Sequence, residues 1–424
     1  MGILIYVTVL ILALLSLLFP WIGVIDGYFS ILLGPHVIWW WTFEGSRHFL
    51  IIATCTLIGV FISIINNKIE AKRLFNKLNL YLFIWMFFII ISYFFGDYVN
   101  GGPGERYFDP AYILGIAIKS FLFYFLSTLC IDNDKKAKFL FLIIIFVSIY
   151  YIIWINQRYL SGHYGRLGGP HGLNISQYGD ENNFAMFFVI SLPFLYFSKN
   201  LITNKFVNYF IWFFIPLGWH AVFLTGSRGG ILGLGAGLIP IVFRPGRRRF
   251  GVVIILALCT VFIWQGGELM KHRAQTITIS QENADSSIMG RLNSWIAATK
   301  MMLKHPITGV GIASFGMAYP DFSEADPREA HNTYFQIGAE SGVIAVVCYL
   351  LFLLSTIREL WRIGRLQINL GNHITNFSSI NMSDAVLSAW TGFATCAFFL
   401  SLQLFEQFFY LAILSNYIII QKEK

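Results

Sequence analysis

The sequence contains little charge for a chain of its length. Only 12% of its 424 residues are charged, whereas 56% are hydrophobic and 17% are aromatic. The mean hydropathy is +0.64. A soluble protein of this size needs more polar surface than this composition supplies. The composition therefore excludes a soluble fold and indicates a polytopic membrane protein.

Cysteines and clustered carboxylates are also scarce. The five cysteines include no CxxC pair, and none lies next to a histidine, so neither a disulfide nor a zinc site is indicated. The acidic residues at Asp180 and between Glu324 and Asp326 lack the dense carboxylate set of a metal cage. We therefore expect neither a metal ion nor a cofactor.

Long apolar runs take up most of the chain. A run of about 17–25 apolar residues is long enough to cross the hydrocarbon core of a bilayer. The runs predict an all-α membrane protein with about twelve transmembrane helices. They cover residues 3–19, 49–66, 79–95, 112–131, 138–156, 184–199, 206–224, 229–243, 250–266, 337–357, 385–402 and 404–421.

One further apolar segment is too interrupted to predict a crossing. Residues 20–48 contain two prolines and three consecutive tryptophans, which favours a re-entrant or interfacial segment. The predicted organisation is therefore a set of N-terminal transmembrane helices over residues 1–266, a polar loop over 267–336, and C-terminal transmembrane helices over 337–424.

The basic residues predict the orientation in the membrane. Most of the 30 Lys and Arg residues lie in short stretches that alternate along the chain with other polar segments. Basic loops mark the cytoplasmic side, so the long polar loop lies on the opposite face, where we expect it to carry short amphipathic helices. The net charge of +8 then reflects topology and contact with membrane lipids. It does not imply a nucleic-acid partner.

An arginine lies where an outside turn enters an apolar helix. Ser227-Arg228-Gly229-Gly230 opens a run with glycines spaced four residues apart, a pattern that lets helices approach closely. The N–H groups of a helix N-terminus favour an anion, and a guanidinium binds phosphate through two hydrogen bonds. Arg228 is therefore either a phosphate ligand or an arginine that only extends to the membrane interface.

A second arginine precedes an amphipathic segment. Apolar residues follow Arg291 at helical spacing, and the segment ends before Pro306. A helix of this kind lies on the outer leaflet and holds Arg291 at the depth of the lipid headgroups. The alternative is a solvated charge on an interfacial helix.

A single histidine ends the polar loop. His331 follows an acidic turn and precedes the apolar run that begins near residue 337. A lone histidine is more often a structural hydrogen-bonding residue than a base. With an ordinary pKa of about 6.5, it is also the side chain best suited to take a proton from an acceptor hydroxyl. Glu340 is close enough in sequence to orient it.

Together these motifs resemble the O-antigen ligase family. The resemblance rests on Ser227-Arg228-Gly229-Gly230, on Met289-Gly290-Arg291-Leu292-Asn293-Ser294-Trp295, and on His331-Asn332 followed ten residues later by Gly342. The motifs occur in this order around a large outside loop. Two further stretches, Pro20–Val24 and Gly179–Ala185, resemble a subgroup of O-glycosylation ligases associated with exosortase systems. Ala345 stands where the family commonly has glycine.

The resemblance implies a metal-independent, inverting glycosyltransferase of the membrane C type. Such an enzyme moves a glycan from undecaprenyl diphosphate to an acceptor hydroxyl on the periplasmic face of the bacterial inner membrane. The acceptor is lipid A core, a protein or another glycan. Arg228 and Arg291 would hold the diphosphate, and His331 would position or deprotonate the acceptor. The other substrate-binding residues expected in these motifs are Trp295, Asn332 and Tyr334.

Two alternatives remain at the level of sequence. One is an O-antigen polymerase, which uses a lipid-linked glycan as acceptor as well as donor. The other is a transporter of lipid-linked oligosaccharides, which should carry polar residues deep in several spans. Only Lys119, His220 and Glu406 look intramembrane, and this small number argues against a transporter.

Overall fold

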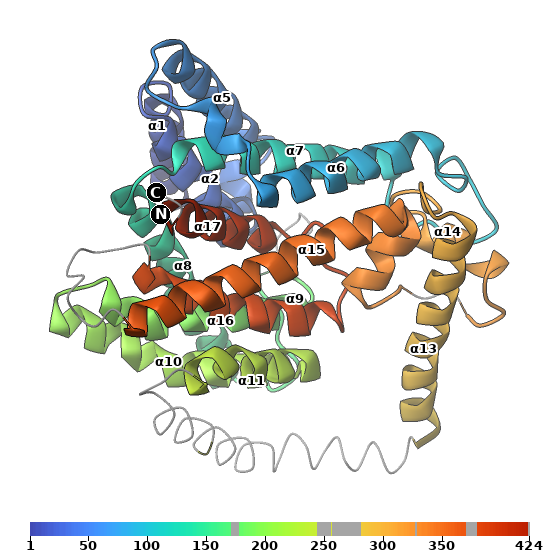
Figure 1. Cartoon of the computed structure of the whole chain (residues 1–424). Helices are drawn as coiled ribbons and strands as arrows, with labels where there is room; N and C mark the ends of the chain where they lie inside the picture. Colours follow the sequence, from blue (N-terminus) through green and yellow to red (C-terminus); the bar gives the residue numbers. More distant parts are fainter. Residues whose placement is uncertain (171–177, 244–255, 257–280, 327–328, 370–379, 423–424) are drawn as a thin grey trace.

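The structure is a computed structural model that describes residues 1–170, 178–243, 256, 281–326, 329–369 and 380–422. These residues form helices and no β-strand (Figure 1). The helices are α1 (Gly2–Leu15), α2 (Pro20–Leu33), α3 (Pro35–Ile38), α4 (Trp40–Phe43), α5 (His48–Ile65), α6 (Lys77–Phe95), α7 (Pro110–Cys130), α8 (Asp134–Leu160), α9 (Glu181–Phe197), α10 (Lys205–Thr225), α11 (Arg228–Val242), α13 (Gln281–Lys304), α14 (Phe315–Ala318), α15 (Thr333–Asn369), α16 (Ile380–Ala397) and α17 (Glu406–Lys422).

The helices confirm the predicted all-α membrane fold. Every predicted apolar run overlaps a helix except 250–266, which lies outside the described residues apart from residue 256. Six of the described helices are long and apolar enough to cross a membrane. They are α5, α6, α7, α8, α10 and the first 33 residues of α15. The chain is thus a multi-pass membrane protein, and the total number of spans stays a prediction.

Helices that are buried on every side form the centre of the bundle. All residues of α9 from Phe184 to Phe197 are buried, as are those of α17 from Gln407 to Ile419. A helix without a polar face has to be covered by neighbours or lipid on all sides. Here the neighbours are protein, since α9 packs against α8, α10, α11 and α16, and α17 packs against α7 and α16.

The segment predicted as re-entrant or interfacial contains α2, which lies inside the bundle against α1 and α5. The packing is close because glycines lie at the contacts between these helices. A Cβ atom at Gly23 would lie 2.0 Å from Oγ1 of Thr56, and one at Gly59 would lie 2.2 Å from the carbonyl oxygen of Ser16. The relation of residues 20–48 to the bilayer stays a prediction.

The polar loop has its own small core. The buried side of α13 contributes Ala297, Ala298 and Met301, which pack against residues 310–339. The loop after α6 is attached to this core, because the hydroxyl of Tyr98 donates to Asp321 at 2.7 Å. Burial, and then this carboxylate, raise the pKa of Tyr98 to about 12, so the hydroxyl remains a donor. Helix α13 starts at Gln281, ten residues before the predicted amphipathic segment, which begins at Arg291.

The long helix α15 is broken at Gly342, which has φ 87° and ψ 171°. At the break, nearby carbonyl groups lack N–H donors from the helix itself. N–H groups of the preceding loop take the place of those donors. The N–H of Val310 donates to the carbonyl of Ala339 at 2.8 Å, and the N–H of Gly311 donates to that of Glu340 at 3.2 Å. The sequence predicted one uninterrupted span here. The interruption fixes the loop after α13 to the start of α15.

Replacing Gly342 with alanine should destabilise the protein strongly. Its backbone lies in a region that only glycine adopts readily, which costs other residues about 1–3 kcal/mol. In addition, a Cβ atom would lie 2.4 Å from the carbonyl oxygen of Ile307. The measurement is thermal unfolding of the purified protein in detergent. Gly115→Ala in α7 is the matched control, because no atom lies within 4 Å of its added Cβ. Equal unfolding temperatures for the two variants would show that the break is dispensable.

Candidate functional site

The first motif forms the beginning of α11. Ser227 is the N-cap, and its hydroxyl accepts from the N–H of Gly230 at 3.2 Å. Arg228 is the first helical residue, and its side chain is exposed. The spaced glycines pack closely, as their pattern predicted, against α16 and the residues that follow it: a Cβ at Gly233 would lie 2.4 Å from Cys396, and one at Gly229 would lie 3.3 Å from Phe399. Close packing against α16 therefore fixes the position from which Arg228 projects.

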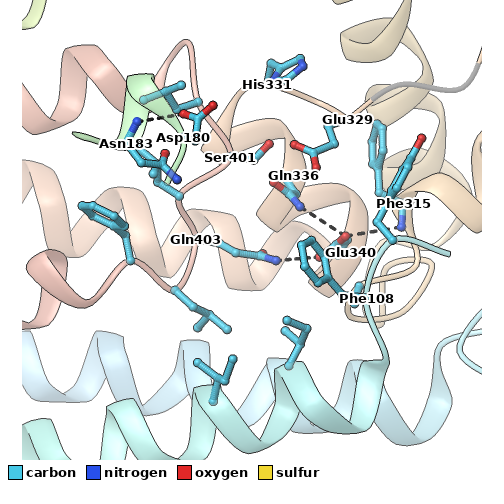
Figure 2. Close-up of a pocket in the computed structure, with 18 of the residues that line it drawn as sticks. Phe108, Asp180, Asn183, Phe315, Glu329, His331, Gln336, Glu340, Ser401 and Gln403 are labelled. Atoms are coloured by element: carbon cyan, nitrogen blue, oxygen red, sulfur yellow. Dashed lines mark hydrogen bonds between the residues drawn. The ribbon is translucent and has the colours of Figure 1, made fainter. Parts of the chain in front are cut away.

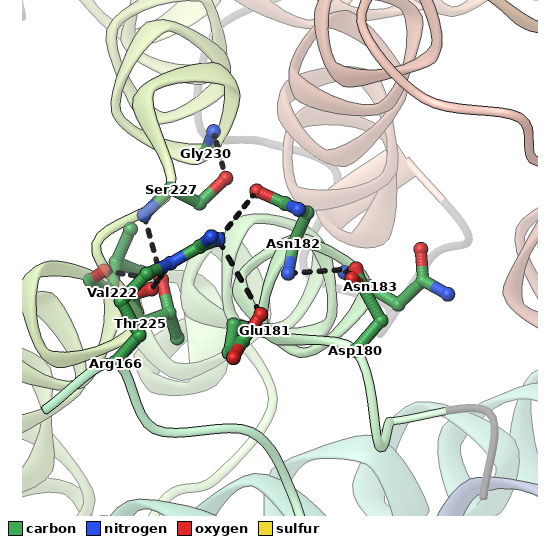
Figure 3. A network of polar contacts seen from close by, with 9 residues as sticks. All are labelled: Arg166, Asp180, Glu181, Asn182, Asn183, Val222, Thr225, Ser227 and Gly230. Atoms are coloured by element: carbon green, nitrogen blue, oxygen red, sulfur yellow. Dashed lines mark hydrogen bonds and ion pairs between the residues drawn. The ribbon is translucent and has the colours of Figure 1, made fainter. Parts of the chain in front are cut away.

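A third arginine, which the sequence did not single out, holds this turn in place (Figure 3). The Nε atom of Arg166 donates to the carbonyl of Thr225 at 3.1 Å, just before the N-cap. Its Nη2 atom donates to Oδ1 of Asn182 at 3.2 Å and lies 3.5 Å from the carboxylate of Glu181. Arg166 thus connects the turn before Arg228 to the start of α9.

The second motif is attached to the third. The indole N–H of Trp295 donates to the carbonyl of Ala330 at 3.0 Å, directly before His331. The indole ring also stacks on Phe335 at 5.6 Å and meets Phe398 edge-on at 5.2 Å. Arg291 lies one helical turn before Trp295, and its side chain is exposed. The stretch from Arg291 to Trp295 therefore lies against the loop that carries His331.

The apolar side chains next to Arg291 are exposed rather than packed. Leu292, Ile296 and Leu303 follow one face of α13 and are 45%, 47% and 77% exposed. The opposite face is the buried one, with Ala297 and Met301. An exposed apolar stripe on a helix beside a membrane bundle suits contact with lipid. This arrangement is the one expected if Arg291 is held at headgroup depth.

The third motif caps α15 and places His331 just before it. The side chain of Asn332 accepts from the N–H groups of Tyr334 and Phe335 at 3.0 and 3.2 Å. His331 itself has φ 45°, an uncommon left-handed conformation for a residue other than glycine. The imidazole is half-buried, and the residue directly precedes the helix that Asn332 begins.

All three motifs meet the connection between α16 and α17, residues 398–405. Gly229 contacts Phe399, Trp295 contacts Phe398, and the side-chain amide of Asn332 donates to the carbonyl of Phe398 at 3.0 Å. The hydroxyl of Thr333 donates to the carbonyl of Leu400 at 2.7 Å. The motif residues far apart in sequence are therefore brought to one place by this short connection.

Sequence reasoning missed this connection. It predicted a span over residues 385–402, whereas α16 ends at Ala397. Side chains of the third motif supply donors to the carbonyls of Phe398 and Leu400, so helical bonding is not needed there. The available signal was polar residues, Ser401, Gln403 and Glu406, in an otherwise apolar stretch.

His331 lines a cavity of about 840 Å³ that the two predicted arginines do not line (Figure 2). The cavity lies between the start of α9, the loop before α15 and the α16–α17 connection. Apart from His331, its polar lining is acidic or neutral: Tyr107, Asp180, Asn182, Asn183, Glu329, Gln336, Glu340, Ser401, Gln403 and Glu406. A lining of carboxylates, amides and hydroxyls suits hydrogen bonding to a polyhydroxyl compound and repels a phosphate.

Glu340 holds the inner end of this cavity together. Its side chain is buried, and it accepts from the amide of Gln403 at 2.8 Å. It also accepts from the N–H of Phe315 at 3.4 Å and the amide of Gln336 at 3.5 Å. From the sequence, Glu340 was a candidate for orienting His331. In the structure its hydrogen bonds join α15 to the loop at Phe315 and to the α16–α17 connection.

The other predicted substrate-binding residues have structural partners. Asn332 uses both ends of its side-chain amide as described above, and Tyr334 donates from its hydroxyl to the carbonyl of Ala394 at 2.8 Å. The indole N–H of Trp295 is likewise bonded. These side chains hold the loop around His331. Among the described residues, no group of three or more His, Cys, Asp or Glu side chains is arranged to hold a metal ion.

Comparison with known proteins agrees with the motifs. A search of curated proteins found no match. A family model described as O-antigen ligase matches residues 213–350, from α10 to the first part of α15, which include Arg228, Arg291 and His331. The match supports a membrane-bound glycosyl-transfer enzyme that uses lipid-linked glycan donors and glycan or lipid acceptors. Over this region it confirms the resemblance that the sequence motifs predicted, so residues 213–350 of the chain are similar to the O-antigen ligase family.

Proposed function

We propose that the chain transfers a whole glycan from undecaprenyl diphosphate to an acceptor hydroxyl, without a metal ion and with inversion at the transferred sugar. The reaction takes place on the periplasmic face of the bacterial inner membrane. The proposal rests on the match to the family model together with the contacts of Gly229, Trp295 and Asn332, neighbours of Arg228, Arg291 and His331 in the three motifs, with residues 398–405.

The two arginines act on the donor. Both side chains are exposed, and Arg291 lies beside an apolar stripe that suits contact with lipid. A diphosphate attached to a membrane lipid lies at the same depth. When the bond between the sugar and the diphosphate breaks, negative charge develops on the leaving phosphate oxygen. Guanidinium groups that are already in place stabilise this charge and take the place of a metal ion.

His331 acts on the acceptor. The acceptor hydroxyl enters the acidic and amide-lined cavity and donates its proton to the imidazole. Its oxygen attacks the anomeric carbon from the side opposite the diphosphate, so that the new bond forms as the old one breaks. Trp295 and Asn332 hold the loop that carries His331 through their bonds to Ala330 and Phe398. This anchoring keeps the imidazole in reach of the hydroxyl.

A deletion strain tests this function and separates it from the alternatives. Deletion of the protein should leave full-length glycan polymer on the lipid carrier, because assembly of the polymer does not need a ligase. It should abolish attachment of the polymer to the acceptor. Analysis of surface glycans and of extracted lipid-linked glycans provides the measurement. Shortened polymer that is still attached would show a polymerase instead, and full-length carrier-linked glycan confined to the cytoplasmic leaflet would show a transporter.

A further inference from the structure

A second cavity, of about 580 Å³, adjoins the one that His331 lines. The two cavities share part of their lining: Phe108, Ile113, Ile116 and Glu406 contribute to both. The second cavity continues from this shared wall along α7, toward α2 and the turn at α3. A molecule long enough to fill both would therefore have one end near His331 and its other end near the middle of α7.

Lys119 places a positive charge in the second cavity. It is the only charged residue of α7, and it is the tenth of 21 residues in a helix that can cross the membrane. At a rise of 1.5 Å per residue it lies about 14 Å from the start of the helix. A charged side chain at such depth is costly unless it has a partner, and it usually marks a ligand pathway.

Lys119 has no such partner among the residues that the structure describes. No ion pair or hydrogen bond joins its ammonium group to Glu406, although both side chains line the cavity. Its side chain is exposed to the cavity. The positive charge is therefore available to an anion that enters from outside the protein.

The remaining lining suits an amphiphile. Most of it is aromatic or aliphatic, with Phe49, Phe123 and Phe409 among the contributing side chains. Ser120 and two histidines supply hydrogen-bonding groups near Lys119, and one of the histidines, His36, has a buried Nδ1 atom without a partner. Apolar walls around a single cation favour a lipid with one anionic group over a free ion.

The charges of the two cavities determine which end of the ligand each cavity binds. The His331 cavity contains several carboxyl groups and neither a Lys nor an Arg side chain, so a phosphate is disfavoured there and hydroxyl groups are accommodated. The Lys119 cavity holds one ammonium group and one carboxyl group, that of Glu406, which also lines the His331 cavity. The part lined by Lys119 therefore favours an anion. We propose that the Lys119 cavity binds the phosphate group of the acceptor lipid. The hydroxyl-bearing end of this lipid extends past the shared lining residues to His331.

The role of this lipid as the acceptor rests on the proposed function, whereas its binding at Lys119 does not. Two probes separate the two sites. Dodecyl phosphate carries one phosphate on an alkyl chain and tests the Lys119 cavity. Farnesyl diphosphate carries a prenyl diphosphate and tests the site at Arg228 and Arg291. Native mass spectrometry of the full chain in a neutral detergent counts the bound copies and gives the apparent affinity of each probe.

The expected result is a crossover between variants. Lys119→Met should weaken dodecyl phosphate binding by about tenfold or more, because a charge-assisted contact is lost. It should leave farnesyl diphosphate binding unchanged. The Arg228→Ala/Arg291→Ala variant should show the reverse. Lys119→Arg should keep the binding of dodecyl phosphate, and inorganic phosphate, which lacks the alkyl chain, should bind far more weakly.

Lys205→Met is the matched control, since it removes a lysine at the exposed start of α10 that lines neither cavity. Equal dodecyl phosphate affinity in Lys119→Met and Lys205→Met would overturn the proposal. So would a loss of farnesyl diphosphate binding in Lys119→Met alone, because the cavity would then hold the donor. If the arginine variant keeps farnesyl diphosphate while Lys119→Met loses dodecyl phosphate, the donor assignment fails and the Lys119 site stands.

Discussion

Replacing His331 with alanine should reduce glycan transfer by about 10²–10⁴-fold, the contribution of a general base to a reaction of this kind. The variant should still bind the lipid-linked donor, because His331 lines the acidic cavity and not the surface from which Arg228 and Arg291 project. The measurement is glycan transfer by the purified protein after reconstitution into lipid membranes. Binding of the donor is determined in parallel. Retained transfer would place the acceptor site elsewhere, with Glu340 and Asp180 as the next candidates.

The backbone at His331 requires a second variant. Alanine at φ 45° is strained, so part of any loss in His331→Ala would come from the loop and not from the missing imidazole. Asparagine tolerates this conformation better and cannot act as a base near neutral pH. His331→Asn should therefore fold as the wild type does and lose as much transfer as His331→Ala. Transfer that is restored in His331→Asn would show that the residue serves only the backbone.

The same assay tests the absence of a metal. Glu324 and Asp326, the acidic pair in the polar loop, are assigned no metal ion in the proposed mechanism. Transfer by the wild type should accordingly survive EDTA. Activity that EDTA removes and that Mg²⁺ or Mn²⁺ restores would contradict the assignment of charge stabilisation to Arg228 and Arg291.

The elements of the fold were predictable because hydrophobicity alone determines them. The apolar runs predicted the positions of the helices, and the glycines after Arg228 predicted that this helix approaches another closely, which the structure shows to be α16. In both cases the signal is local, since it lies in consecutive residues or in a fixed spacing along one helix. The family match likewise follows from short motifs that can be recognised without knowing how they meet in space.

The arrangement of the site was not predictable, because it depends on contacts between distant segments. The connection at residues 398–405 looked like the end of one span and the start of another, and its contacts with Gly229, Trp295 and Asn332 cross large distances in sequence. Arg166 gave no signal of its own, since its role consists of bonds to two other segments. The break at Gly342 was hidden because a single glycine inside a helical pattern does not by itself end a predicted span.

The structure also divides the predicted site into two parts with different charge. His331 lies with carboxyl and amide groups in a cavity, whereas the exposed side chains of Arg228 on α11 and Arg291 on α13 lie outside that cavity. A transferase with two substrates needs this separation, since one substrate carries a diphosphate and the other a neutral hydroxyl. Variants on the two sides should therefore affect different substrates.

Alanine at Arg228 or at Arg291 should impair the donor side, and each change should reduce turnover by at least about tenfold. Each removes a charge-assisted contact that contributes about 1.5–3 kcal/mol when it is desolvated in the complex. Neither change should unfold the protein, because both side chains are exposed and the Ser227 cap and the Trp295 contacts remain. Turnover and donor affinity of the purified variants provide the measurement.

Lysine at either position should restore only part of the activity, because an ammonium group lacks the planar pair of donors that matches a phosphate. Lys304→Ala is the control on the same helix as Arg291. Its ammonium group lies 5.2 Å from the ring centre of Phe322, and we assign it no contact with the donor. It should therefore retain wild-type turnover. If both alanine variants are fully active at normal expression, or if Lys304→Ala is as impaired as Arg291→Ala, the diphosphate is bound by other groups and the two arginines act only through the general charge of this surface.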